Sequence, residues 1–224
     1  MVFIQMNKTS QTVIVKRRQK IGVIIPVLKK LFPHAKISLH YSNHIELLFA
    51  VMLSAQCTDK VVNKVTDKLF KKYKIIKDYV NADQREFEMD IKSTGFYHTK
   101  AKNILATAKI IHIEFNDKVP NSMDALLTLP GVARKTANIV LANAFHVLDG
   151  IAVDTHVRRI AKLYGLTTQD DPEKIERDLM EVVPHKYWAL ITNLFIEYGR
   201  TYCPARQHDH AQCPLTIVLA KAKL

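Results

Sequence analysis

Apolar residues recur at spacings of three and four along most of this chain, and strand-like alternation is rare. Prolines fall at the breaks in this pattern, and the 224 residues include only six glycines, so the periodic stretches have few internal interruptions. The pattern predicts an all-α fold of about ten helices joined by short loops. The clearest periodic segments are 45–55, 59–72, 101–115, 133–145 and 173–183.

Two helix starts carry recognisable capping chemistry. The stretch Pro120-Asn121-Ser122 precedes a short apolar segment that stops at Pro130-Gly131. Asp171 is predicted to be the N-cap of a later helix, because Pro172 suits the first helical position. These signals fix where two of the helices begin.

The chain is strongly basic, with 33 Lys and Arg against 21 Asp and Glu, a formal charge of +12 and a pI of about 9.6. An excess of this size indicates a polyanionic partner, and nucleic acid is the first choice. Solubility alone is the alternative reading. The bases are spread along the chain rather than gathered beside an apolar anchor, so a membrane surface is disfavoured.

Signals for a membrane or for secretion are missing from the sequence. The longest apolar run, Leu47 to Leu53, is far shorter than the roughly 20 residues of a membrane span. The first 20 residues lack the ordered sections of a secretory signal. Three cysteines, Cys57, Cys203 and Cys213, are too few for a disulfide scaffold and suit a reducing compartment. We therefore expect a cytoplasmic protein without a targeting signal, associated with the nucleoid if bacterial.

The segment "LPGVAR", residues 129–134, separates two short predicted helices and so predicts a helix–hairpin–helix. Gly131 permits a tight turn and a close approach of the backbone to another molecule. Free N–H groups at the start of the second helix can hold a phosphate, which positions DNA without reading its sequence. Pro-Gly turns between helices are common elsewhere, so the basic composition is needed to favour DNA.

Lys135 lies in the first turn of that second helix. The helix dipole and neighbouring Arg134 both disfavour its ammonium form, and only the neutral amine attacks carbon to form a Schiff base. A charged, phosphate-binding lysine is the alternative. Asp154, before Thr155-His156, is a predicted N-cap. It either balances a basic face or supplies a carboxylate that accepts a proton or stabilises a sugar cation.

Four segments stand out along the chain, "LLFAVMLSAQCTD", "STGFYHTKAKNI", "LPGVARKTANIVLANAF" and "IAVDTHVRRIAKLYGL". Taken together they resemble the endonuclease III family of DNA repair enzymes. The resemblance runs in order from about residue 21 to Cys213, which is most of the chain. A lysine at the position of Lys135 marks the bifunctional glycosylase/lyases of this superfamily, which argues against its adenine-removing members.

The resemblance implies two helical lobes. A six-helix barrel lobe with the helix–hairpin–helix spans 37–148, and residues 1–36 and 149–224 form the second, with a degenerate cluster loop at 203–219. The implied protein is a monomer that binds double-stranded DNA with a damaged base or an abasic site. Lys135 and Asp154 are then the catalytic residues, which remove oxidised pyrimidines and cut the strand on the 3′ side by β-elimination.

The resemblance also implies a set of DNA-binding residues. Gln56 matches the glutamine that fills the gap left by the flipped nucleotide, although a buried amide bonded to backbone is the alternative. Phe96 stands where relatives usually have a wedging leucine, and Ala133 replaces the second glycine of the hairpin. The full predicted set is Gln56, Gly95, Phe96, Gly131, Ala133, Arg134, Thr136 and His156.

The family commonly carries an iron–sulfur cluster on four cysteines near its C-terminus. The corresponding positions are Cys203, His210, Cys213 and Leu219. Because leucine cannot ligate and only two thiols remain, we predict no cluster and no metal. Zinc on Cys203, His208, His210 and Cys213 is the alternative, but ordinary packing of these residues is favoured.

Two other functions remain compatible with these features. One is an AP lyase without glycosylase activity, for which the departures at Phe96 and Ala133 leave room. The other is a non-catalytic helix–hairpin–helix DNA-binding protein. The presence of both Lys135 and Asp154 argues against the second, because binding alone requires neither residue.

Overall fold

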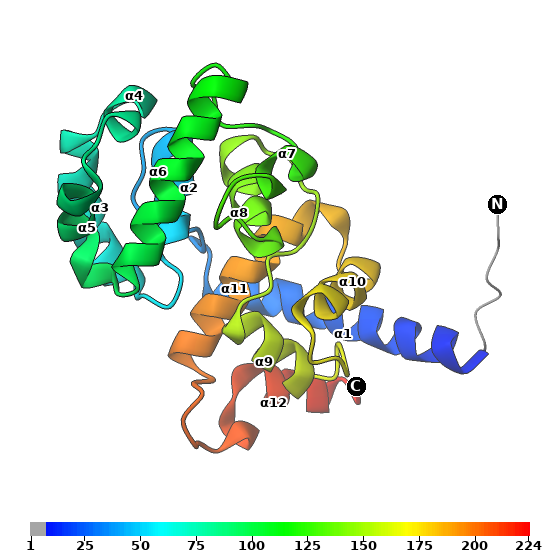
Figure 1. Ribbon diagram of the computed structural model, residues 1–224. Helices are drawn as coiled ribbons and strands as arrows, with labels where there is room; N and C mark the ends of the chain where they lie inside the picture. Colours follow the sequence, from blue (N-terminus) through cyan, green and yellow to red (C-terminus); the bar gives the residue numbers. More distant parts are fainter. Residues whose placement is uncertain (1–7) are drawn as a thin grey trace, which may run out of the picture. The chain divides into compact units, whose positions relative to one another are not determined.

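The computed structural model describes residues 8–224 as a chain of helices with no strand in that range, which confirms the predicted all-α class (Figure 1). Short 3-10 helices stand at Lys92–Thr94, His185–Tyr187 and His210–Gln212. The α-helices are α1 Lys8–Leu31, α2 His44–Leu53, α3 Asp59–Lys72, α4 Ile76–Val80, α5 Gln84–Ile91, α6 Tyr97–Glu114, α7 Met123–Leu127, α8 Arg134–Ala144, α9 Thr155–Leu163, α10 Pro172–Val182, α11 Trp188–Thr201 and α12 Pro214–Lys221.

The chain divides into two compact units. One is continuous and spans Ser38–Asp149; the other joins Met1–Ile37 to Gly150–Leu224. The lobes implied by the sequence resemblance were 37–148 and 1–36 with 149–224. The continuous unit holds α2 to α8, of which α4 and α7 are only five residues long, and the discontinuous unit holds α1 and α9 to α12.

Helix α2 is the centre of the continuous unit. Every residue from Leu47 to Leu53 is buried, so the helix is apolar on all sides, as a helix enclosed by others must be. It begins where Asn43 Oδ1 accepts a hydrogen bond of 3.0 Å from the N–H of Glu46. Helices α3, α6 and α8 pack against it.

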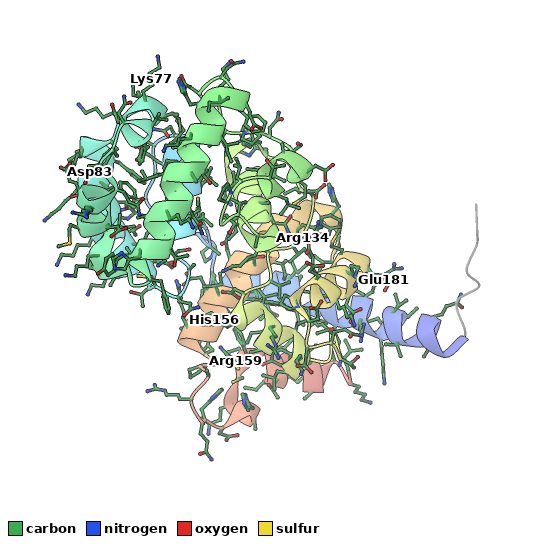
Figure 2. The ribbon with its side chains drawn as sticks, in the orientation of Figure 1. Lys77, Asp83, Arg134, His156, Arg159 and Glu181 are labelled. Carbon is green, nitrogen blue, oxygen red and sulfur yellow. The ribbon has the colours of Figure 1, made fainter. Side chains whose placement is uncertain are left out.

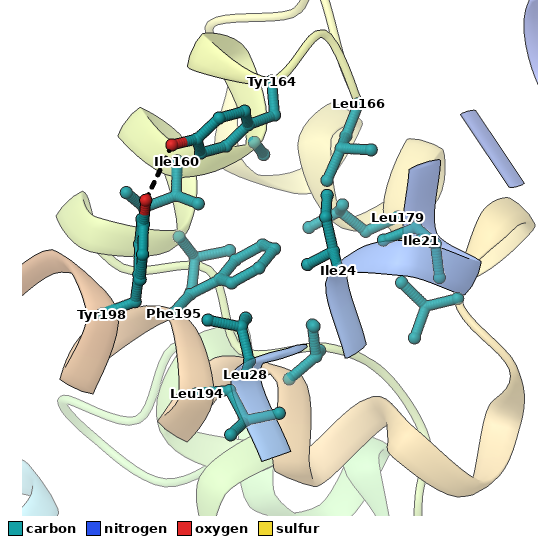
Figure 3. Close-up of a cluster of buried hydrophobic side chains, with 14 of the residues drawn as sticks. Ile21, Ile24, Leu28, Ile160, Tyr164, Leu166, Leu179, Leu194, Phe195 and Tyr198 are labelled. Carbon is teal, nitrogen blue, oxygen red and sulfur yellow. Dashed lines mark hydrogen bonds between the residues drawn. The ribbon is translucent and has the colours of Figure 1, made fainter. Parts of the chain in front are cut away.

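The discontinuous unit is held together by burial of one face of α1. Ile24 and Leu28 lie among the buried side chains of α11, including Phe195 (Figure 3). Above them the hydroxyl groups of Tyr164 and Tyr198 lie 2.8 Å apart, the dashed contact in Figure 3. Segments far apart in the sequence thus share one core, which is why residues before Ile37 belong with the C-terminal half of the chain.

Several local predictions are confirmed. The predicted helix 59–72 has the observed bounds of α3. Asp171 is the N-cap of α10, where its carboxylate accepts from Lys174 N–H at 3.0 Å and Pro172 is the first helical residue. Among residues 8–224, no helix has both the length and the apolar character needed to cross a bilayer.

Candidate active site

The predicted helix–hairpin–helix is formed by α7, a turn at 128–133, and α8. Gly131 has a φ of +79°, a left-handed conformation that favours glycine. A Cβ atom at this position would lie 2.7 Å from Nδ2 of Asn103, so glycine is also required for space. The turn is tied to α6, because the hydroxyl of Thr107 donates to the carbonyl of Pro130 at 3.0 Å.

The first turn of α8 presents the hairpin residues named in the sequence analysis. Its N-cap, Ala133, makes no side-chain capping bond, and its φ of −95° and ψ of 169° are open to any residue. The glycine usual at that position is therefore not needed for its backbone conformation. Lys135 is exposed and Thr136 is half-buried. Half-buried Arg134, labelled in Figure 2, has a guanidinium nitrogen 4.0 Å from the carboxylate of Asp149.

Beside the hairpin turn, the continuous unit has a hollow of about 250 Å³. Three predicted DNA-binding residues, Gln56, Phe96 and Gly131, line it. The segments that carry them are far apart in the sequence. The structure therefore brings together three positions that the sequence could only propose one at a time. The remaining lining residues are Met52, Ala55, Thr99, Lys100 and Asn103.

Two residues of this hollow have an unusual backbone. Gln56 and Phe96 have φ values of +53° and +49°, in the left-handed region that non-glycine residues rarely adopt. Gly95, next to Phe96, is also at positive φ, +69°. Phe96 is 66% exposed. Left-handed backbone of this kind costs on the order of 1–3 kcal/mol per residue and concentrates at binding sites.

Lys100 is a buried residue of this site that sequence reasoning missed. Its Nζ donates to the carbonyl oxygens of Leu53 and Thr94, both at 2.8 Å. It thereby joins the end of α2, just before Gln56, to the turn before Phe96, and burial lowers the pKa of its amine. The only sequence signal is its place beside Ala101 and Ile104 on the buried face of α6.

In the discontinuous unit, the predicted N-cap role of Asp154 is confirmed. Its carboxylate accepts a 2.8 Å hydrogen bond from the N–H of Val157 at the start of α9, and the residue is half-buried. His156, two residues further on, has Nδ1 3.3 Å from Nη2 of Arg159, and both side chains project from α9 in Figure 2. A Cβ atom at Gly199 would lie 2.5 Å from His156 Nδ1, so the glycine makes room for the ring.

The loop between α11 and α12 brings four donor residues together. One ligand atom each from Cys203, His208, His210 and Cys213 lies within 4.8 Å of the others, so this group can hold a metal ion. Ordinary packing of these side chains was expected from the sequence, which does not show the loop's path. Burial raises the pKa of the Cys203 thiol to about 11. Leu219, at the fourth cluster position, is buried in the apolar core instead.

Comparison with known proteins gives a consistent result. Residues 49–185 match the family of HhH-GPD superfamily base excision DNA repair proteins. Endonuclease III of Synechocystis sp. is 46% identical over 207 residues, covering 92% of this chain and 94% of the relative. Endonuclease III of Bacillus subtilis is also 46% identical, covering 83% of this chain and 84% of the relative.

Two solved structures are similar in both fold and sequence. A non-covalent endonuclease III–DNA complex has a TM-score of 0.86 and 41% identity, covering 92% of this chain and 96% of that one. A trapped endonuclease III–DNA covalent intermediate has a TM-score of 0.84 and 42% identity, covering 88% and 93%.

Proposed function

The chain belongs to the endonuclease III family of base-excision DNA repair proteins, and we propose that it removes oxidised pyrimidines from duplex DNA through Lys135 and Asp154. The family resemblance drawn from four sequence segments is confirmed. As a member of this family the chain is a DNA glycosylase and AP lyase that acts on damaged duplex DNA. We propose which residues perform the reaction and which kind of damaged base is removed.

One observation carries the assignment of residues. Gly131, four positions before Lys135 in the same hairpin, lines the hollow that Gln56 and Phe96 also line. Exposed Lys135, in the first turn of α8, therefore follows directly on a turn that is already part of the candidate DNA-binding surface. A lysine that only balanced surface charge could lie anywhere on the surface, whereas Lys135 lies in the hairpin that borders this hollow.

The reaction follows from the chemistry of an amine and a deoxyribose carbon. The neutral nitrogen of Lys135 attacks C1′, and the bond from C1′ to the base breaks, so that the base leaves with the bonding electrons. The adduct becomes a protonated imine after the sugar ring opens. Loss of a proton from C2′ then expels the oxygen on C3′, and the strand is cut on the 3′ side. Asp154 accepts the proton of the lysine or stabilises positive charge on the sugar.

The proposed DNA contacts are of two kinds: contacts to phosphates, which position the duplex, and contacts inside the base stack. The N–H groups at the start of α8, whose N-cap Ala133 makes no side-chain capping bond, and the side chains of Arg134 and Thr136 suit phosphate oxygens, which fix the duplex without reading bases. Gln56 and Phe96 suit the space left in the base stack by an extruded nucleotide. His156 is proposed to contact DNA from α9. We propose that this protein holds no iron–sulfur cluster. We also propose that it acts in the cytoplasm as a monomer.

Trapping of the imine tests the proposal. Duplexes with thymine glycol or an abasic site are mixed with protein and borohydride, which reduces the imine to a stable amine. We expect a covalent adduct on both duplexes, its loss in Lys135→Gln, and its retention in Lys109→Gln, an exposed lysine on α6. Adduct on the abasic duplex alone would indicate a lyase without glycosylase activity. If neither duplex formed an adduct while DNA binding was retained, the protein would only bind DNA and the proposed chemistry would be refuted.

A further inference from the structure

The donor set at the C-terminal loop does not fit the iron–sulfur cluster common in this family. A cubane cluster is normally held by four thiolates, and this loop supplies only Cys203 and Cys213. The position of the fourth ligand is Leu219, which has no donor atom and is 5% exposed within the core of its unit. The loop still has two imidazoles, from His208 and His210, beside the two sulfur atoms.

Two sulfur–nitrogen distances within this group are those expected between ligands of one tetrahedral ion, and all four ligand atoms lie within 4.8 Å of one another. Sγ of Cys203 lies 3.6 Å from Nδ1 of His210, and Sγ of Cys213 lies 3.4 Å from Nε2 of His208. Zinc–sulfur and zinc–nitrogen bonds of about 2.3 and 2.1 Å, about 109° apart, place the two ligand atoms about 3.6 Å from each other. The observed contacts match that separation.

The histidine nearest Cys213 is already held in a metal-binding tautomer. Nδ1 of His208 lies 2.9 Å from the carbonyl oxygen of Arg206, and since a carbonyl only accepts, Nδ1 carries the proton. The lone pair of the neutral ring is then on Nε2, the atom that faces the sulfur of Cys213. Outer-shell bonds of this kind orient ligating histidines in known metal sites.

Charge near the thiol of Cys203 also suits an ion with thiolate ligands. Nη1 of Arg159 lies 3.8 Å from Sγ of Cys203 and donates to the carbonyl oxygen of the same residue. A guanidinium at this place offsets the negative charge that the sulfur carries when it is a ligand. Two thiolates and two neutral imidazoles around a divalent ion would add no net charge to this buried corner.

We propose that Cys203, His208, His210 and Cys213 bind one Zn²⁺ ion in place of the family's iron–sulfur cluster. Tetrahedral sites with two sulfur and two nitrogen ligands favour zinc, which is redox-inert and has no open position here for catalysis. The ion has a structural role: it closes the loop that leads from α11 to α12. Helix α12 buries Leu215 and Leu219 in the core, so the ion fixes that helix against its unit.

A binuclear iron–sulfur site with two cysteines and two histidines is the nearest competitor, because its ligand count is the same. In that centre both thiolates bind one iron and both imidazoles bind the other. Each sulfur would then stand apart from the imidazoles. In this loop each sulfur is instead in direct contact with one imidazole nitrogen, which favours a single shared ion.

Metal analysis of tag-free protein, purified with a phosphine reductant and without chelator, tests the proposal directly. We expect about one zinc per chain, and in cobalt-substituted protein the intense visible bands of tetrahedral cobalt with a thiolate charge-transfer band in the near ultraviolet. Zinc below about a tenth of an equivalent without a cobalt spectrum would refute the site. Stoichiometric iron with acid-labile sulfide, or a quantitative disulfide between Cys203 and Cys213 under reductant, would refute it as well.

Histidine variants make the test specific while sparing the buried cysteines. The double change His208→Ala with His210→Ala should weaken zinc binding at least a hundredfold in competition with a chromophoric chelator. His34→Ala, an exposed histidine of the same unit, is the matched control and should bind zinc like the parent. Removal of zinc should also lower the thermal midpoint of the parent but not of the double variant. Equal zinc affinity in the double variant and the control would overturn the ligand assignment.

Discussion

Phe96 combines two features that a folded protein would avoid without a purpose. Its φ is +49°, and this apolar residue is 66% exposed. Both features are explained if the ring inserts into a base stack when DNA binds. Because the ring packs on little in the free protein, its loss should hardly change stability.

Shortening this side chain tests that role. Phe96→Ala should weaken binding to a duplex with a stable abasic analogue by about fivefold or more, since stacking on one base contributes roughly 1–3 kcal/mol. Phe96→Leu, which restores the residue usual in relatives, should keep most of the affinity. Fluorescence anisotropy at constant salt measures both. Equal affinity of Phe96→Ala and the parent would show that the ring does not reach the DNA.

Lys100 is expected to act as a positioning residue for the same surface. Its two hydrogen bonds join Leu53 to Thr94, which lie just before Gln56 and Phe96. Lys100→Met keeps most of the volume but leaves two buried carbonyl groups without this donor, at a cost of about 1–3 kcal/mol. We expect lower stability in urea and a slower rate of imine trapping.

The control for Lys100 lies two residues away. Lys102 is exposed on the same helix, so Lys102→Met should leave both stability and trapping close to the parent values. If Lys100→Met lowered stability but trapped the imine at the parent rate, the lysine would support the fold alone and not the placement of Gln56 and Phe96.

At the scale of the helix, Asp154 has a structural role as an N-cap, and experiments must distinguish this role from its proposed part in the reaction. Its carboxylate caps α9, as that of Asp171 caps α10. Asparagine caps nearly as well as aspartate, whereas alanine loses the cap at a cost of about 1 kcal/mol. Asp154→Asn should therefore keep the thermal midpoint but slow imine trapping at least tenfold. Asp154→Ala should lower both.

Asp171→Ala is the matched control, because it removes an exposed cap of the same type in the same unit. It should lower the thermal midpoint about as much as Asp154→Ala while the trapping rate stays at the parent value. If Asp154→Asn trapped as fast as the parent, the carboxylate would be a cap and nothing more.

At the scale of the whole chain, sequence reasoning worked where local rules decide the structure. The bounds of α3, the caps at Asp154 and Asp171 and the turn at Gly131 each follow from a few neighbouring residues. It failed where distant segments meet. Nothing local to Lys100 reveals that two carbonyl groups lie above it, and nothing in a short polar loop shows that His208 and His210 turn towards the cysteines.

The two units carry very different charge. The unit that joins Met1–Ile37 to Gly150–Leu224 has 18 Lys and Arg against 9 Asp and Glu, whereas Ser38–Asp149 has 15 against 12. Some of this charge is used internally: Arg17 pairs with Asp178 at 3.2 Å, and Lys162 with Asp170. Most of the excess remains for a polyanion, so the discontinuous unit should supply much of the attraction to phosphate.

That excess predicts how affinity depends on salt. Each phosphate neutralised by a lysine or arginine releases counterions, with a slope of about −0.9 in log affinity against log salt for duplex DNA. Three or more such contacts lower affinity by about fortyfold or more between 50 and 200 mM salt. Because phosphate contacts carry no information about the base, an undamaged duplex should show nearly the same slope as one with an abasic analogue, and the ratio of the two affinities should stay almost constant.

Anisotropy titrations at several salt concentrations measure both slopes. A ratio that fell with salt as steeply as the affinities would mean that recognition of the damaged site itself depends on charge, and a flat profile would mean that the basic surface serves another purpose than DNA binding.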